Sequence, residues 1–440
     1  MKSFSVDLGQ MLEARERRAA IQNKMFEGAG PQMCLVCLTM NIAGDVKRTP
    51  MTRMLFDHGA AQLKSSGFSI AKEYVLDEVT GSEAFWLLNE EGTRVKAMLE
   101  ETEDSFPAAR LFDFDVILPG GSKLSRAEGR RCLICDAYAA ECSRSRRHGL
   151  DEVKRATDKL LKEFCAEKLA KAAHDSLLDE LYTTPKPGLV DMNNNGAHSD
   201  MDVRMFEKSA DALAPYFKDA ARLGMERCGI SLLRERGIRA EAEMFAATGG
   251  VNTHKGLIYS MGLLLAGMGR SLADGGSCIG HAAGLAREDS EAQLGKALEA
   301  PVTNGGAVYK TYGAKGATGE AAAGFPDALY CLGRLDFYRE NGCADPAALA
   351  LCDSMASLED TNLLHRGGME GLDYVRQEAA RISEMPAADR TGALQRLDRE
   401  LIIRILSPGG SADMLALAFL LERWRALSAG LFTDEREDRQ

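Results

Sequence analysis

The pattern of apolar and polar positions changes about one third of the way along the chain. In the first part, short runs rich in β-forming residues alternate with segments of helical periodicity. After an opening helix over residues 6–26, we predict strands over 33–42, 68–77, 83–89 and 108–118, and helices over 49–65 and 94–102. This β-α-β-β-α-β order is that of the ferredoxin-like split βαβ unit. The first part is therefore expected to be an α+β domain built on a four-stranded antiparallel sheet.

From Leu150 onward the strand pattern disappears. Residues 151–182 form one long helical pattern without Pro or Gly, so we place the domain boundary at the start of this helix, with domains at 1–150 and 151–440. Further helices are predicted over 201–225, 240–248, 255–273, 291–298, 327–340, 346–357, 371–382, 394–406 and 413–426. The second domain is therefore expected to be all-α.

Bulk composition narrows the functional classes. A chain of 440 residues is longer than one hydrophobic core usually organises, which favours two domains. The formal net charge is -11 and no long Lys/Arg block is present, so nucleic-acid binding is not expected. The first residues lack the apolar segment of a secretion signal, and the apolar run Gly256 to Met268 is too short to span a bilayer. With 11 cysteines, we expect a cytoplasmic protein with reduced or metal-bound thiols and no membrane partner.

Three polar, glycine-containing clusters stand between the predicted helices of the second domain. They read TPKPGLVDMNNNGAHSDMD (184–202), GGVNTHKG (249–256) and SPGGSAD (407–413). Glycines let backbone N–H groups approach an anion, lysines neutralise it, and carboxylates hold a metal ion. Any one of these residues can be explained as a helix cap or a turn, but their recurrence predicts a site for a phosphate-rich nucleotide. Lys186, between two prolines, is expected to be a solvated lysine that grips phosphate.

Asp113 and Asp115 lie two residues apart in the last predicted strand of the first domain. Side chains at this spacing share a face of the sheet, where two carboxylates can hold Mg²⁺ and through it a triphosphate. The alternative is a solvated strand face. Because the flanking residues of RLFDFDV are apolar, we favour the metal site.

A cysteine cluster follows, with the spacing C-x2-C-x6-C-x5-H in Cys132, Cys135, Cys142 and His148. Three thiolates and an imidazole can bind Zn²⁺ tetrahedrally. A helix that buries small thiols, with Arg131 and Arg144 contacting anions, explains the same residues. The sequence leaves both interpretations open.

At these motifs the chain resembles two known families. Residues 171–423 resemble the triphosphoribosyl-dephospho-coenzyme A synthase family, through TPKPGLVD, NNGAH-x-DM, VNTHKG, DTN…RGG and LSPGGSAD. Residues 12–148 resemble the phosphoribosyl-dephospho-coenzyme A transferase that acts on the citrate lyase acyl-carrier protein. That likeness rests on Lys47, Arg53, His58, ARLFDFDV and the cysteine cluster. One motif of the synthase family is not fully matched in this chain. Thr318 and Ala322 stand where the family has an arginine and a glutamate, and Lys315 can supply the missing positive charge.

The resemblance implies a fusion of two consecutive transferases. The first joins ATP to 3'-dephospho-coenzyme A with loss of adenine, and the second transfers the product to a serine of the apo acyl-carrier protein with loss of pyrophosphate. Mg²⁺ is expected at both sites. The implied catalytic residues are Asp113, Asp115, Asp191, Asp200 and Asp360, and the implied Mg²⁺ ligands are Asp113, Asp115, Asp202 and Asp413. The implied substrate-binding residues are Lys47, Arg53, Arg131, Lys186, Gly196, His198, Asn252, Thr253, His254, Lys255, Gly256, Glu320, Asn362, Arg366, Gly409 and Gly410.

Two other enzymatic functions stay open. An ADP-ribosyl-type hydrolase, also helical with Asp-rich metal loops, explains the second domain alone. The same prosthetic group also serves malonate decarboxylase, although the N-terminal resemblance favours citrate lyase. A binding or scaffolding module explains the helices but not the repeated phosphate-binding residue types.

Overall fold

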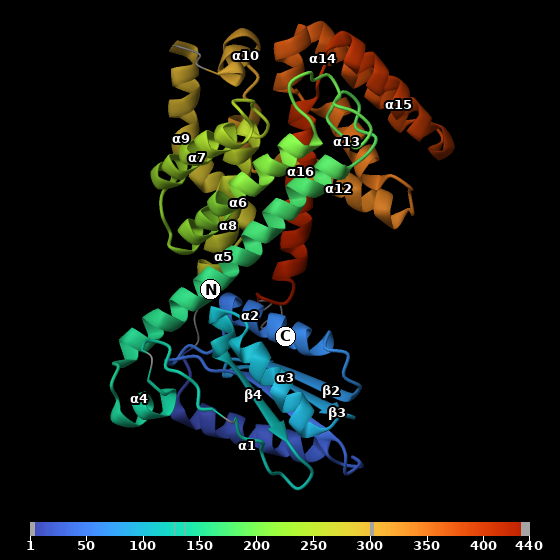
Figure 1. Ribbon diagram of the computed structural model, residues 1–440. Coiled ribbons are helices and arrows are strands. Elements are labelled where there is room, and N and C mark those ends of the chain that lie inside the picture. The colour runs from blue at the N-terminus through green and yellow to red at the C-terminus, as the bar shows by residue number, and fades with distance from the viewer. Residues whose placement is uncertain (1–4, 127, 136, 300–302, 433–440) are drawn as a thin grey trace, which may run out of the picture. The chain divides into compact units, whose positions relative to one another are not determined.

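The computed structural model describes residues 5–126, 128–135, 137–299 and 303–432. The chain forms two compact units, one of Met1–Cys165 with Ser428–Gln440 and one of Ala166–Leu427 (Figure 1). The units divide inside helix α5 (Leu150–Tyr182), whereas the change of sequence pattern places the boundary at its start. Each unit has its own core.

The first unit contains a four-stranded antiparallel sheet. Its order is β2 (Ile70–Glu78), β3 (Gly81–Leu88), β1 (Cys34–Met40) and β4 (Phe112–Ile117). Helix α2 (Pro50–Lys64) joins β1 to β2, and α3 (Gly92–Asp104) leads from β3 toward β4. This is the connectivity of the split βαβ unit, so the predicted α+β fold is confirmed.

Both faces of the sheet are covered, which explains why β1 and β3 read as continuous apolar runs. The cluster on the face covered by α1 (Leu8–Met25) comprises Met25, Leu35, Cys37, Phe85, Leu87 and Ile117. On the other face, Phe112 packs so closely on α2 that a Cβ added to Gly59 would lie 2.8 Å from its ring.

Several local predictions need correction. Residues 108–111 were predicted as the start of a strand but form the 3-10 helix η1 (Pro107–Leu111), because Pro107 fixes a helical φ at its first position. Sequence periodicity also missed three short helices, α4 (Ala139–Ser145), α10 (Asn304–Tyr312) and α11 (Gly316–Ala323). These helices have seven to nine residues, too few to show a clear apolar repeat.

The second unit is helical throughout its described residues, as predicted. After α5 its longer helices are α6 (Val203–Met225), α7 (Ile230–Ala247), α8 (Lys255–Asp274), α9 (Cys278–Glu299), α12 (Pro326–Glu340), α13 (Pro346–Ser357), α14 (Thr361–Ser383), α15 (Ala387–Arg404) and α16 (Gly409–Ser428). Helices α7, α9 and α14 begin ten to thirteen residues before the starts predicted at 240, 291 and 371. In α14, Gly368 interrupts the helical backbone with a φ of 60°.

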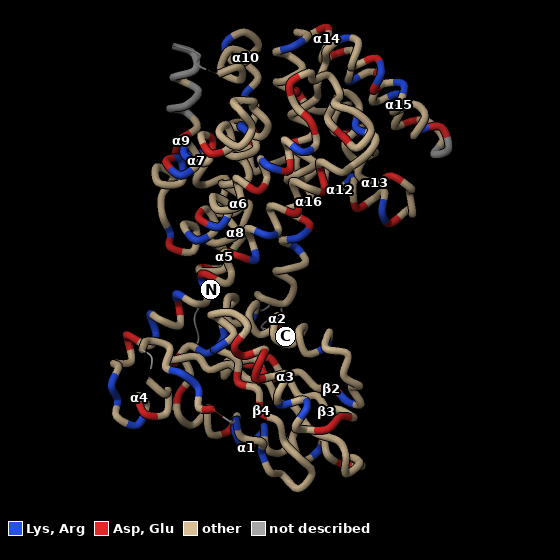
Figure 2. Tube along the Cα trace, in the orientation of Figure 1, with Lys and Arg blue, Asp and Glu red and all other residues tan. Residues whose placement is uncertain are grey.

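Helices α8 and α16 form the centre of this unit, and their traces carry few charged residues (Figure 2). Helix α8 packs so closely on α6 that a Cβ added to Gly269 would lie 2.1 Å from the carbonyl oxygen of Ala221. By length and composition α8 is the one described helix that could cross a membrane, but 78% of its most apolar window is buried inside the protein. Such burial is what a core helix shows.

Candidate functional site

The second unit contains a cavity of about 1440 Å³ where the N-terminal ends of α8, α14 and α16 meet. The cavity brings together most of the residues predicted from the separate motifs. Those that line it are Lys186, His198, Asp200, Asn252, Thr253, His254, Lys255, Gly256, Glu320, Asp360, Asn362, Arg366, Gly409, Gly410 and Asp413. Asp191, Gly196 and Asp202 are not part of the lining.

These three residues shape the neighbouring loop. The Asp191 carboxylate accepts backbone N–H bonds from Lys186, Asn193 and Asn194, at 2.7 to 3.1 Å. Gly196 has a φ of +57°, and a Cβ there would lie 2.5 Å from the backbone of Leu189. Asp202 caps α6. Their contacts fit roles in folding the loop better than the catalytic, phosphate-binding and metal-binding roles inferred from the sequence.

Asp360 fastens two helix ends together at the cavity. Its Oδ1 accepts the N–H groups of Asn362 and Leu363 at 2.9 and 3.3 Å, which caps α14. Its Oδ2 accepts the N–H and the hydroxyl of Ser411 in the first turn of α16, at 2.8 and 3.1 Å. The side chain is 1% exposed. This geometry fits a positioning role better than the catalytic role that the resemblance implies.

The prediction that Lys186 is a solvated lysine is wrong, because the residue is only 2% exposed. Its Nζ lies 2.6 Å from Oε1 of Glu180, a residue of α5 that is also buried. Both side chains line the cavity, so the pair places a buried charge at its wall. Sequence reasoning missed Glu180, since it is one of many acidic residues in a long helix and its partner lies outside that helix.

Asp413 is the carboxylate of the cavity with the most unusual environment. It is the fifth residue of α16, and no hydrogen bond or ion pair joins it to another described residue. Burial, followed by the nearby charges of Asp360 and Glu180, raises the pKa of Asp413 well above its ordinary value. A carboxylate held without a protein partner beside two others is suited to bind a cation or a proton.

The GGVNTHKG segment is held by contacts with α6 and α7. The Ser209 hydroxyl lies 2.7 Å from Nδ1 of His254 and accepts a 2.7 Å hydrogen bond from Thr253. Burial, together with the charge of Lys186, lowers the pKa of His254 to about 3, so its ring is neutral. Lys255 pairs with Glu241.

Two further contacts join distant motifs at the cavity. His198 lies 2.9 Å from the Ser407 hydroxyl through Nε2 and 3.2 Å from Arg366 through Nδ1. Glu320 accepts the N–H groups of Asp327 and Ala328 at 2.8 and 3.1 Å, and burial raises its pKa to about 7. A glutamate with this pKa can hold or release a proton near neutral pH.

In the first unit, Asp113 and Asp115 point to the same face of β4, opposite Thr39 and Cys37 of β1. Both carboxylates are partly exposed and each has a basic neighbour. Asp113 lies 3.4 Å from Arg130, and Asp115 lies 2.6 Å from Lys123. The carboxylates thus occupy an open, charged part of the face.

The sequence singled out Arg131, but Arg130 is the arginine at this strand. Arg130 also donates to the carbonyl of Phe112 at 2.8 Å, whereas the Arg131 guanidinium lies over the Tyr138 ring at 4.5 Å. The choice between adjacent arginines depends on which side of the chain faces β4, and no sequence pattern indicates it.

The other residues carried over for the transfer reaction have separate contacts. Lys47 donates to the carbonyl of Ile42 at 2.6 Å. Arg53 pairs with Asp57 at 2.8 Å and with Asp77 at 2.6 Å. His58 packs against the stacked rings of Phe106 and Phe164. No contact of the described residues joins Lys47 or Arg53 to Asp113 or Asp115.

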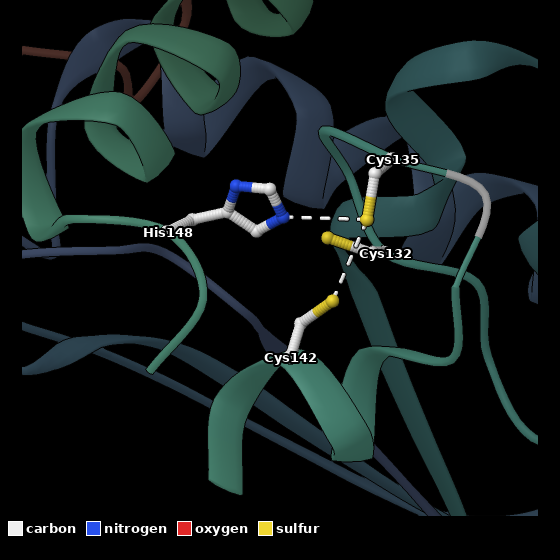
Figure 3. A group of neighbouring side chains, drawn as sticks. All are labelled: Cys132, Cys135, Cys142 and His148. Atoms are coloured by element: carbon white, nitrogen blue, oxygen red, sulfur yellow. Dashed lines mark hydrogen bonds between the residues drawn. The ribbon is translucent and has the colours of Figure 1, made fainter. Parts of the chain in front are cut away.

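The cysteine cluster is assembled in space (Figure 3). One donor atom from each of Cys132, Cys135, Cys142 and His148 lies within 4.8 Å of the others. Hydrogen bonds from the Ala137 backbone and from His148 lower the pKa of Cys135 to about 6, while burial raises that of Cys142 to about 11. The four side chains point toward one another, which the packing interpretation does not require.

Comparisons with known proteins match the two units of the chain to two different families. The apo-citrate lyase phosphoribosyl-dephospho-CoA transferase family matches residues 6–164, and the ATP:dephospho-CoA triphosphoribosyl transferase family matches residues 166–430. The chain is 33% identical to "Protein CitXG" of Haemophilus influenzae, over 96% of this chain and 97% of that protein. The chain belongs to this family of fused transferases. The resemblance stated from the motifs is therefore confirmed, and the protein is an enzyme of the transferase class.

Other relatives cover either the whole chain or its second part. "Protein CitXG" of Leuconostoc mesenteroides subsp. cremoris is 30% identical over 95% of this chain and 97% of its own length. The "2-(5''-triphosphoribosyl)-3'-dephosphocoenzyme-A synthase" of Klebsiella pneumoniae is 38% identical over 60% of this chain and 94% of its own length. The family names associate the chain with synthesis of the citrate lyase prosthetic group.

Proposed function

We propose that this chain both makes and attaches the prosthetic group of citrate lyase. In the first reaction ATP and 3'-dephospho-coenzyme A give 2'-(5''-triphosphoribosyl)-3'-dephospho-coenzyme A and adenine. In the second, a serine of the apo acyl-carrier protein attacks the product and pyrophosphate leaves. Because ATP and coenzyme precursors are intracellular, the proposed place of action is the cytoplasm.

The observation that carries the first reaction is the convergence of three helix N-termini and several carboxylates on one cavity. The positive ends of the α8, α14 and α16 dipoles favour a polyanion such as triphosphate. Single drug-sized ligands occupy roughly 300–1,000 Å³. The cavity of about 1440 Å³ therefore has room for ATP together with part of a second nucleotide.

We assign the reacting groups of this site from their contacts. The ribose 2'-hydroxyl of the coenzyme attacks the anomeric carbon of ATP, the bond to adenine breaks with its electron pair passing to the base, and the hydroxyl proton passes by way of a carboxylate to the departing adenine. Asp413 and Glu320 are the candidates, since burial raises the pKa of both. The exposed Asp200 carboxylate can stabilise positive charge that develops on the ribose.

The unpartnered Asp413, beside Glu180 and Asp360, also fits a divalent cation. The residues that would hold Mg²⁺ are Asp413 and Glu180, because the oxygens of Asp360 already accept four hydrogen bonds from the protein. When bound, Mg²⁺ would neutralise part of the triphosphate charge.

The second reaction is assigned to the face of β4. The serine hydroxyl of the carrier protein attacks the α-phosphorus, the bond to the pyrophosphate oxygen breaks, and a phosphodiester forms. Asp113 and Asp115 would hold Mg²⁺, while Arg130 and Lys123 lie beside them to contact phosphate oxygens.

One assay tests the proposal and separates it from its rivals. The protein is incubated with ATP labelled in its adenine base, with and without dephospho-coenzyme A, and free adenine is measured by chromatography. Adenine release that requires the coenzyme supports the synthase. Release of ADP-ribose-type products by water alone would support a hydrolase instead.

Adding purified apo carrier proteins to the same mixture tests the second step. Mass spectrometry is expected to show a mass increase on the citrate lyase carrier protein, and loss of that increase when its acceptor serine is changed to alanine. Preferential modification of a malonate decarboxylase carrier protein would support the alternative pathway.

A further inference from the structure

The cysteine cluster lies outside the residues assigned to either reaction. We propose that Cys132, Cys135, Cys142 and His148 bind one zinc ion, and that this ion fixes the segment that carries Arg130. Three thiolates and one imidazole are a common ligand set of structural zinc sites.

The donor atoms lie close to the spacing that zinc requires. Tetrahedral bonds of about 2.3 Å to sulfur and 2.0 Å to nitrogen place sulfurs roughly 3.8 Å apart and sulfur and nitrogen roughly 3.5 Å apart. The Cys135 and Cys142 sulfurs are 3.5 Å apart, and Nε2 of His148 is 3.3 Å from Cys135. All four donor atoms lie within 4.8 Å of one another. A disulfide bond needs sulfurs about 2.0 Å apart and would leave Cys132 and His148 without a role.

Neighbouring groups orient the ligands. Nδ1 of His148 faces Glu152, in the first turn of α5, at 3.4 Å, and Nε2 points toward the thiols (Figure 3). A carboxylate behind a histidine is the usual outer contact of zinc sites. The N–H of Ile134 points to the Cys132 sulfur at 3.5 Å and would stabilise its thiolate.

The cluster is connected to the strand of the proposed transfer site. Arg110, just before β4, donates to the carbonyls of Arg131 and Cys132 at 2.8 and 2.7 Å. The carbonyl of Arg130 accepts the N–H of Ala139 at 2.8 Å, and its side chain reaches Asp113 at 3.4 Å. Zinc would fix the loop from Cys132 to His148, and the backbone contact between Ala139 and Arg130 would pass this constraint to Arg130. The Arg130 side chain is then held beside β4, where it also pairs with the buried Glu103.

Metal analysis of the full-length protein tests the site. Protein purified without chelator is expected to contain about one zinc per chain, and cobalt exchanged into it should give the visible absorption of tetrahedral cobalt thiolate. His148→Ala should weaken binding, at least tenfold, while His148→Cys should retain zinc because it replaces one accepted ligand with another. Cys343→Ser is the matched control, since Cys343 is a partly exposed thiol outside the cluster, and should retain zinc.

The positioning role rests on the proposed function and has its own readouts. Removing zinc from wild-type protein with a chelator should increase proteolysis between Arg130 and His148 and reduce transfer to the carrier protein at least tenfold. Adenine release should not change, and adding zinc back should restore transfer. Because zinc content and proteolysis do not depend on the reaction, failure of the metal site and failure of the proposed function are distinguishable.

Three results would overturn the inference. The first is protein without zinc after growth and purification with zinc, with Cys135 and Cys142 found as a disulfide or as free thiols. The second is equal zinc content in His148→Ala, or in the Cys135→Ser variant, and in wild type. The third, loss of zinc with unchanged proteolysis and transfer, would refute the positioning role.

Discussion

Breaking the buried ion pair at the cavity wall should affect stability and activity separately. Lys186→Met removes the ammonium but leaves the Glu180 carboxylate buried near the acidic Asp413 and Asp360. Removal of one partner from a buried pair costs about 3–5 kcal/mol of the free energy of unfolding. For a unit of this size each kcal/mol lowers the melting temperature by about 2–4 °C, so we expect a decrease of roughly 6–20 °C.

The double variant Lys186→Met with Glu180→Gln removes both charges and should recover most of this loss, because no unpaired charge stays buried. It should still release adenine at least tenfold more slowly than wild type, equivalent to about 1.4 kcal/mol of transition-state stabilisation. Scanning calorimetry measures the first effect, and adenine release well below the unfolding transition measures the second.

Lys255→Met is the matched control for stability. Lys255 also lines the cavity and also pairs with a glutamate, Glu241, but it is 37% exposed, so its loss should cost less than about 1 kcal/mol. If Lys186→Met melts like wild type, or if Lys255→Met is destabilised equally, burial is not what makes the first pair important. A fully active double variant would exclude Lys186 from the reaction.

Three further predictions follow from the geometry of the two sites. Asp360→Ala should lose about 1–4 kcal/mol of stability in chemical denaturation, because two helix ends lose their cap, whereas the exposed Asp200→Ala should lose little; equal losses would refute the capping role. Asp113→Asn with Asp115→Asn should abolish transfer to the carrier protein but leave adenine release within about twofold, and a parallel loss of both activities would indicate misfolding. Because burial raises the pKa of Glu320 to about 7 from an ordinary 4.5, its contribution to stability is present below pH 4.5 and is lost as pH rises through 7. The melting temperature of wild type relative to Glu320→Gln should therefore fall between pH 5 and pH 8, and a constant or rising difference would contradict the raised pKa.

Local sequence patterns were sufficient for the succession of strands and helices along the first unit and for the helical nature of the second. Period-two and period-3.6 apolar repeats report directly on which residues can be buried together, so β1, β3 and six of the ten long helices in the described part of the second unit were predicted within a few residues, whereas α7, α9, α14 and α15 begin seven or more residues earlier than predicted. Pro107 and Gly368 show where this reasoning failed, because each changes the backbone without changing the apolar pattern.

The motifs also identified the residue types of the cavity, because a polyphosphate needs glycine-rich helix starts, cations and carboxylates in any fold. The sequence alone determined that these groups are present. Only the tertiary structure decided which of them face the cavity and which fold the loops around it. Asp191 and Asp360 accept hydrogen bonds from backbone N–H groups. Lys186, in a loop, forms an ion pair with Glu180 of α5, and Asp413 has no hydrogen-bond or ion-pair partner among the described residues. A polar side chain acquires its role from the groups that surround it, and those groups come from distant parts of the chain that meet only on folding.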